Sequence, residues 1–260
     1  MSRQQQILAE IGIRPLWQLR NPAIVEALVE EAAAQPAPAQ AASLEQPAPT
    51  PAAMPAPTAA DVHPQETSQP APPAVINISD WDDLHAQVAA CQQCQLARTR
   101  SNTVVGRGNR QARLLIIGEA PGEQEDLQGL PFVGKAGHLL ENMLAAAGFD
   151  SARDVYICNL LKCRPPGNRN PAQDEIVKCQ RFLQWQIESV DPELIVAVGR
   201  FAAQSLLQST ASLGNLRGKQ HQYGRYPVLV SFHPAYLLRS PGEKAKAWQD
   251  WCRVRQLLQK

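Results

Sequence analysis

Residues 113–137, RLLIIGEAPGEQEDLQGLPFVGKAG, connect a predicted strand to a predicted helix through an unusually long loop. The apolar run at 113–117 is typical of a buried strand, and HLLENMLAAAG, which follows residue 137, has helical periodicity. The loop at 118–137 has twenty residues, whereas such connections usually have about two to six. Its five glycines indicate a backbone that is shaped around a ligand.

Strand and helix patterns alternate through the chain from residue 78 onward. Apolar, β-branched stretches predict strands at 113–118, 155–161, 193–199 and 227–232. Helical periodicity predicts helices at 79–98, 136–147, 172–190, 200–208 and 243–258. Buried strands separated by helices form mostly parallel sheets that are covered on both faces. We therefore expect an α/β fold with three α/β/α layers and a mostly parallel, four-stranded central sheet.

The composition divides the chain into three parts. Residues 35–77 contain half of the 22 prolines and few large apolar residues, which predicts a disordered linker. Residues 1–34 are predicted to form an amphipathic docking peptide, with Leu16 and Trp17 in its apolar cluster, ahead of a folded domain at 78–260. The alternative is that this peptide folds back onto the main domain.

Charge is distributed unevenly between these parts. Residues 1–77 hold 3 Lys and Arg against 7 Asp and Glu, and residues 78–260 hold 22 against 17, within a net charge of +1. A mildly basic domain is compatible with a polyanionic partner but is not sufficient to indicate one. We see no signal peptide, and no apolar run approaches the roughly 20 residues that span a bilayer, so we expect a cytoplasmic protein without a membrane partner.

The six cysteines need an explanation other than disulfides, because cytoplasmic thiols stay reduced. Cys91 and Cys94 form a C-x2-C pair that we expect on the first helix of the domain, and Cys163 and Cys179 follow further along the chain. Four thiolates with one close pair can hold zinc or an iron–sulfur cluster, and their spacing does not separate the two. The alternative is four unrelated reduced thiols.

Four chemically distinct side chains are predicted to converge at one edge of the sheet. They lie near strand ends or in the long loop: Glu119, Phe132, Asn159 and His233. Ligands of open α/β sheets bind outside the carboxyl ends of the strands, so we expect these side chains to share one cleft. Taken singly, Phe132 could be a core residue, His233 a helix cap and Asn159 a turn former.

Three motifs together resemble the family-4 uracil-DNA glycosylases, which carry a [4Fe–4S] cluster. They are GEAPGEQEDLQGLPFVGKAG at 118–137, NLLKCRPPGNRNP at 159–171 and HPAYLLRSP at 233–241, and their order and spacing agree with the family over roughly residues 80–260. The resemblance implies a uracil-DNA glycosylase-like fold and the release of uracil from DNA in base excision repair. It also favours iron over zinc, because the family's cluster ligands fall on Cys91, Cys94, Cys163 and Cys179.

The same resemblance assigns roles around a flipped base, since a base inside a duplex must be extruded before an enzyme can act on it. Three consecutive residues would line the uracil pocket: Gly118, Glu119 and Ala120. Glu119 would position the attacking water, Phe132 would stack on the base, and His233 would lie against the negative charge that develops on uracil O2. Asn159 would read the amide edge of uracil, because its side chain offers both a donor and an acceptor.

Basic and apolar residues in the motif loops are candidates for contacts with the DNA. We expect Arg164, Arg169 and Arg239 to bind phosphates, with a solvated basic face as the alternative. Leu237 and Leu238 are candidates for a wedge that fills the gap left by the base, although packing against the sheet accounts equally well for either. We interpret the acids Glu123, Glu125 and Asp126 of the long loop mainly as scaffolding.

The N-terminal peptide RQQQILAEIGIRPLWQLRNP, at 3–22, is similar to the start of the psi subunit of bacterial DNA polymerase III. That resemblance implies docking on the clamp-loader collar through Trp17. Two hypotheses follow for a protein that we expect to be monomeric. The first is an active glycosylase tethered to the replisome, and the second is a non-catalytic psi-type subunit that uses the glycosylase fold as a DNA-binding module.

Overall fold

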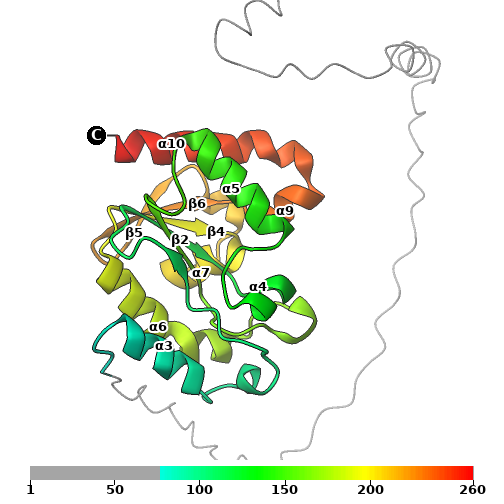
Figure 1. The fold of residues 1–260 in the computed structure, drawn as a ribbon. Coiled ribbons are helices and arrows are strands. Elements are labelled where there is room, and N and C mark those ends of the chain that lie inside the picture. The colour runs from blue at the N-terminus through cyan, green and yellow to red at the C-terminus, as the bar shows by residue number, and fades with distance from the viewer. Residues whose placement is uncertain (1–76, 260) are drawn as a thin grey trace, which may run out of the picture. The chain divides into compact units, whose positions relative to one another are not determined.

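The computed structural model describes residues 77–259, which form a six-stranded sheet between two layers of helices (Figure 1). Four parallel strands make the centre of the sheet, in the order β3 (Val155–Asn159), β2 (Leu114–Gly118), β4 (Leu194–Val198) and β6 (Tyr226–Ser231). Every residue of β2, β3 and β4 is buried, as expected for a sheet covered on both faces. The predicted fold class and parallel central sheet are confirmed.

Two short edge strands were not predicted. β1 (Arg107–Gly108) pairs antiparallel with β3, and β5 (Gln220–Tyr223) pairs antiparallel with β6. Both are polar and partly exposed, so neither has the apolar pattern that identifies a buried strand. They extend the predicted four strands to six.

Strand residues alternate between two apolar cores, one on each face of the sheet. On one face, Leu114 and Ile116 of β2 pack with side chains of α5 (Lys135–Ala147) and α10 (Lys244–Leu258). On the other face, Leu115 and Ile117 pack with α6 (Gln173–Val190) and α7 (Arg200–Leu207). These four helices lie close to the predicted ranges and complete the three layers.

The first helix is shorter than predicted. α3 (Trp81–Ala90) begins after Asp80, whose side chain accepts hydrogen bonds from the N–H groups of Asp82 and Asp83, and it ends at an extended Cys91 with φ −64° and ψ 128°. The 3-10 helix η1 (Gln95–Arg98) then follows an extended Cys94. The C-x2-C pair therefore lies in the loop between two helices, and the prediction that it lies on a helix is wrong.

Further short helices surround the carboxyl edge of the sheet and had no signal in the sequence periodicity, because each has six residues or fewer. They are α4 (Glu123–Gln128), η2 (Pro166–Asn168), α8 (Leu213–Leu216), α9 (Pro234–Arg239) and η3 (Pro241–Glu243). α4 lies inside the long loop at 118–137. The loop is therefore partly helical.

The predicted docking peptide at 1–34, with Leu16 and Trp17, lies outside the residues that the structure describes, as does all but the last residue of the predicted linker at 35–77. Within 77–259, no helix has both the length and the apolar character that crossing a membrane requires.

Candidate active site

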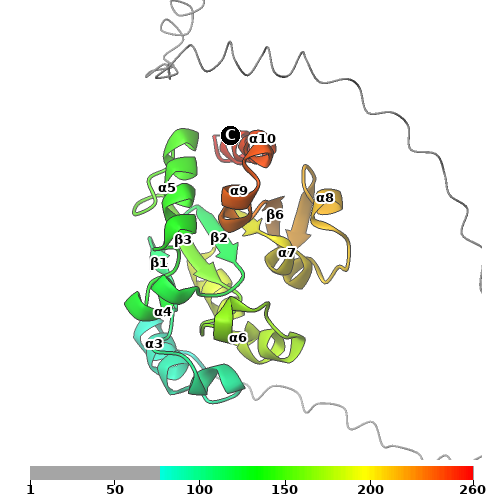
Figure 2. The ribbon, with the colours of Figure 1, turned by 90° about the vertical axis from the view of Figure 1, so that its right-hand side faces the viewer.

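A cleft of about 710 Å3 opens at the carboxyl edge of the parallel strands. Figure 2 views the domain from this side, with α9 and α4 on opposite sides of the end of β2. The four predicted side chains Glu119, Phe132, Asn159 and His233 all line the cleft, together with Ala120. The prediction that these four side chains share one cleft is therefore confirmed, although they lie far apart in the sequence.

Asn159 is a buried polar residue of the cleft, with 2% of its surface exposed. It is the last residue of β3 and pairs in register with Gly118 at the end of β2. Its Oδ1 atom is buried and has no hydrogen-bond partner among residues 77–259. A buried acceptor without a donor costs about 1–3 kcal/mol, so this oxygen is available to a donor on a ligand.

Gly118 allows Asn159 and Phe132 to approach each other closely. A Cβ atom at Gly118 would collide with Asn159 Oδ1 and would lie 2.7 Å from Phe132 Cζ. Only glycine avoids both contacts. The absence of a side chain at Gly118 therefore lets the Asn159 amide and the Phe132 ring both pack against this position.

Phe132 has a backbone conformation that is uncommon for a bulky residue, with φ at 55°. Its ring lies 5.6 Å from the ring of His233, centre to centre, at an angle of 30°. Such strained residues cost about 1–3 kcal/mol and gather at functional sites. Phe132 also joins the apolar core on the α5 face, so the core and stacking interpretations are both compatible with its position.

Glu125 holds the two arms of the long loop together. Its Oε1 accepts hydrogen bonds from the N–H groups of Val133 and Gly134, both at 2.9 Å, and its Oε2 accepts one from Gly122 at 3.1 Å. Asp126 likewise accepts from the N–H groups at residues 101 and 102. These contacts confirm the predicted scaffolding by Glu125 and Asp126.

His233 caps α9, because its Nδ1 accepts a hydrogen bond from the N–H group of Ala235 at 3.2 Å. Nε2 therefore carries the proton in the neutral ring. Burial, assisted by the nearby charge of Arg239, lowers the pKa of His233 to about 4. The ring is thus neutral near pH 7, with Nε2–H as a donor. Nδ1 therefore serves as the helix cap, and Nε2–H remains as the donor for the ligand-binding interpretation.

Glu119 and Arg200 are two of the charged residues that line the cleft. Burial raises the pKa of Glu119, and the positive charge of Arg200 opposes that shift. Arg200 begins α7 directly after Gly199, whose φ of 96° turns the chain at the end of β4. Our sequence analysis missed Arg200, although the same strand-end argument applied to β4 would have identified it.

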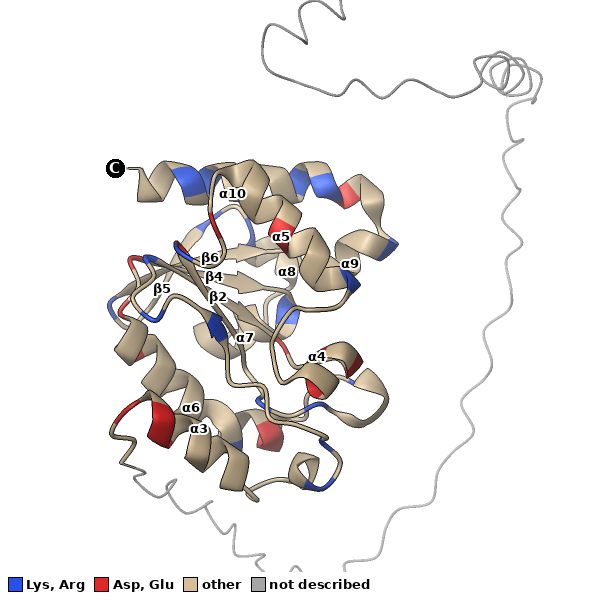
Figure 3. Cartoon of the chain, viewed as in Figure 1, with Lys and Arg blue, Asp and Glu red and all other residues tan. Residues whose placement is uncertain are grey.

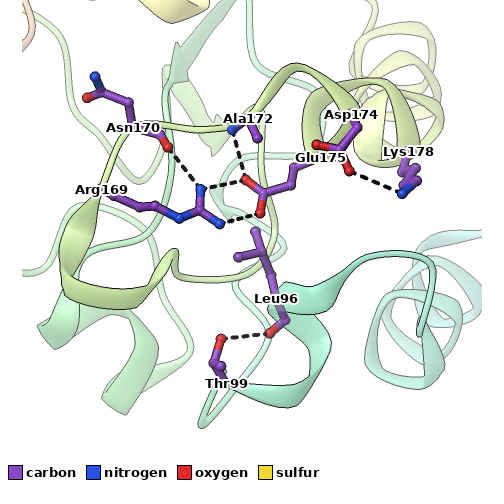
Figure 4. A network of polar contacts seen from close by, with 8 residues as sticks. All are labelled: Leu96, Thr99, Arg169, Asn170, Ala172, Asp174, Glu175 and Lys178. Atoms are coloured by element: carbon purple, nitrogen blue, oxygen red, sulfur yellow. Dashed lines mark hydrogen bonds and ion pairs between the residues drawn. The ribbon is translucent and has the colours of Figure 1, made fainter.

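The candidate DNA contacts differ in their placement. Arg169 and Arg239 line the cleft, and Arg169 also pairs with the carboxylate of Glu175 (Figure 4). Arg164 donates to Asn168 Oδ1 at 2.8 Å. Basic residues also lie along α10, away from α4 with its acids (Figure 3). Of the three predicted arginines, Arg169 and Arg239 therefore line the cleft, and Arg164 is not among its lining residues.

The two leucines of the third motif point to different environments. Leu237 is fully buried and packs with Phe232 and Ala247, so it does not form a surface wedge, and that prediction is corrected here. Its neighbour Leu238 is 43% exposed. Tyr236, which the sequence analysis did not single out, lines the cleft and stacks on Phe232.

The four predicted cysteine ligands line one small cavity: Cys91, Cys94, Cys163 and Cys179. Arg100 Nη1 lies 3.1 Å from Cys163 Sγ, and Arg181 Nη2 lies 3.7 Å from Cys91 Sγ. Within 77–259, no three side chains of the ligand-forming types lie close enough to hold a metal ion. The four cysteines share the lining of this cavity with apolar and basic residues.

Comparison with known proteins agrees with this geometry. The uracil DNA glycosylase superfamily matches residues 105–252. The chain is 40% identical over 184 residues to the type-4 uracil-DNA glycosylase of Archaeoglobus fulgidus, covering 68% of this chain and 92% of that protein. It is 42% identical over 190 residues to that of Saccharolobus solfataricus, with 70% and 88% covered, and 44% identical over 156 residues to that of Thermotoga maritima, with 59% and 81% covered. The chain therefore belongs to the type-4 uracil-DNA glycosylases of the uracil DNA glycosylase superfamily.

Proposed function

We propose that this protein hydrolyses the N-glycosidic bond of deoxyuridine that is flipped into the cleft, and releases uracil in base excision repair. The observation that carries the proposal is the buried, unpartnered Oδ1 of Asn159 beside the Phe132 ring. Oδ1 accepts the N3–H of uracil, and the amide Nδ2 donates to O4. Cytosine has an acceptor at N3 and a donor at C4, so the same amide rejects it.

The remaining cleft residues act on the glycosidic bond. Phe132 stacks on the base and holds its plane beside the Asn159 amide. As the C1′–N1 bond breaks, its electron pair moves to the base, and His233 Nε2–H donates to the O2 atom where negative charge accumulates. Glu119 orients a water molecule, whose oxygen bonds to C1′ while its proton passes to the carboxylate.

The cysteine cavity fits an iron–sulfur cluster better than four unrelated thiols. Its donors are all sulfur, and they come from the loop after α3, the chain after β3 and helix α6. Cys91, Cys94, Cys163 and Cys179 would hold a [4Fe–4S] cluster, which supplies a covalent link between these segments. Nearby guanidinium groups of Arg100 and Arg181 stabilise negative charge on the sulfur atoms.

Contacts with DNA follow from the rim of the cleft. Arg169 and Arg239 are suited to phosphates flanking the flipped nucleotide, and the exposed Leu238 is suited to fill the space that the base leaves. Arg164 is a weaker candidate because it already bonds within its own loop. We also propose that the active protein is a monomer.

The decisive experiment is release of uracil from an oligonucleotide with one deoxyuridine, read as alkali-labile cleavage at the abasic site. The same oligonucleotide with deoxycytidine should stay intact. Glu119→Ala and His233→Ala should each slow cleavage by about a hundredfold or more. Glu193→Ala is the matched control, because Glu193 lies at the opposite end of β4 and pairs with the exposed Arg113. No cleavage by the wild-type protein at any salt concentration would reject the proposal.

A tether to the replisome is a separate proposal, carried by the peptide at 1–34 and the Pro-rich segment that follows it. Leu16 and Trp17 would dock on the clamp-loader collar. Clamp-loader subunits should bind the full chain, and Trp17→Ala should abolish binding without changing uracil release. If binding persists in Trp17→Ala, the docking proposal fails. If uracil release is absent but binding remains, the non-catalytic psi-type function is favoured.

A further inference from the structure

Lys162 lies between the cysteine cavity and the base-reading residue. It is 1% exposed, lies one residue before Cys163 and lines the same cavity as the four cysteines. Its Nζ donates a hydrogen bond of 2.7 Å to the backbone carbonyl of Asn159. The ammonium of Lys162 therefore contacts the residue that faces the base, and Lys162 also borders the cysteine cavity.

This charge has no carboxylate partner within residues 77–259, since none of the ion pairs there includes Lys162. A buried ammonium without an opposite charge is costly. The sulfur ligands provide the missing negative charge when they are thiolates around a cluster. Lys178, which also lines the cavity, already pairs with Asp174 at 3.2 Å, so its charge is balanced without the sulfur ligands.

The contact from Lys162 reaches Asn159 at the end of β3. Its pairing with Gly118 is the last register contact between β2 and β3. No protein donor holds its side-chain oxygen within the described part of the chain. The next residue, Leu160, still donates to the Gly118 carbonyl at 3.0 Å, and Lys162 adds the side-chain hydrogen bond to the Asn159 carbonyl itself.

We propose that Lys162 is a positioning residue that couples the iron–sulfur site to uracil recognition through the Asn159 backbone. The ammonium balances the negative charge of the cluster and at the same time fixes the Asn159 carbonyl. Loss of the cluster therefore weakens uracil binding through the position of Asn159, although no residue of the cleft is substituted. The inference rests on the proposed function, because it needs both a cluster and a uracil site.

The test measures binding of free uracil to the full-length protein by calorimetry, with the iron content of every sample determined. Lys162→Met has a similar length but no charge, and should weaken uracil binding by about tenfold. Lys162→Arg keeps the charge and an N–H donor, and should retain more iron and bind uracil more tightly than Lys162→Met. Lys178→Met is the matched control and should resemble the wild type in both measurements.

A second comparison separates positioning from general stability. In an Asn159→Ala background, Lys162→Met should weaken uracil binding no further, because its effect passes through Asn159. Fully additive effects would overturn the proposal. The proposal would also be overturned if Lys162→Met retained iron and bound uracil as well as Lys162→Arg does. A purely apolar packing role predicts that result. A wild-type protein that binds neither iron nor uracil would instead reject the proposed function.

Discussion

At the residue scale, Gly118 has the most restrictive surroundings in the cleft. A methyl group there would meet Asn159 Oδ1 and the Phe132 ring. Gly118→Ala should therefore reduce kcat/KM for uracil release by about a hundredfold or more, because it displaces two groups that hold the base. Gly214→Ala is the control, since a Cβ atom at Gly214 meets nothing within 4 Å. Equal activity of the two variants would contradict the packing argument.

The pH dependence of activity should follow Glu119. Burial raises the pKa of Glu119, so its carboxylate takes up a proton at a higher pH than an ordinary glutamate. Activity should fall as the pH is lowered through that raised pKa. His233, with a pKa of about 4, stays neutral over most of this range. The acid limb of the kcat profile should disappear in Glu119→Gln, and its persistence there would assign the limb to another group.

Several polar residues of the cleft could be predicted from sequence because they follow strands that are themselves easy to recognise. Asn159 and Glu119 follow continuous apolar runs, and the ends of parallel strands share one edge. Arg200 was missed although it follows the third such run. Leu237 was misassigned because its burial depends on α9 packing over α5 and α10, which the motif alone does not specify.

At the element scale, a buried network ties α10 to β6 just before His233. Asp250 accepts two hydrogen bonds from Arg217, both at 2.9 Å, and one from Ser231 at 2.8 Å. Asp250→Ala would leave Arg217 without its partner, so it should lower the free energy of unfolding by about 3–5 kcal/mol. Urea denaturation measures this.

The control for that variant is an exposed ion pair. Arg113 and Glu193 are both more than half exposed, so Glu193→Ala should cost about 1 kcal/mol or less. A similar loss in the free energy of unfolding for Asp250→Ala and Glu193→Ala would mean that burial does not determine the strength of the Asp250 network.

The elements that sequence could not predict are short and depend on tertiary contacts. β1 and β5 have polar residues and form only because a longer strand lies beside them. α4 is held by Glu125, whose carboxylate oxygens accept hydrogen bonds from the N–H groups of Gly122 before the helix and Gly134 after it. The C-x2-C loop interrupts the predicted first helix because Cys91 and Cys94 both have extended backbones.

At the scale of the whole molecule, the residues that line the cleft all lie between 119 and 239, and the described fold begins at residue 77. A truncated protein that begins at residue 68, where the second compact unit starts, should release uracil from a short oligonucleotide with kcat/KM within about twofold of the full chain. Steady-state kinetics on both proteins measures this.

A large loss of activity on truncation would show that the N-terminal part acts in catalysis and not only in docking. Short oligonucleotides are essential to this comparison, since they offer no second binding partner that a tether could exploit.

The in-register pairing of Gly118 with Asn159 has a thermal consequence. These two residues belong to the central strands of the sheet, whereas Phe132 belongs to a loop whose backbone is held by side chains, Glu125 and Arg107. Loops open at lower free-energy cost than central strands do. On warming, the stacking platform should loosen first, so the enzyme should become slow while it still distinguishes uracil from cytosine. Discrimination between uracil and cytosine would then persist at temperatures at which the rate of uracil release has already fallen.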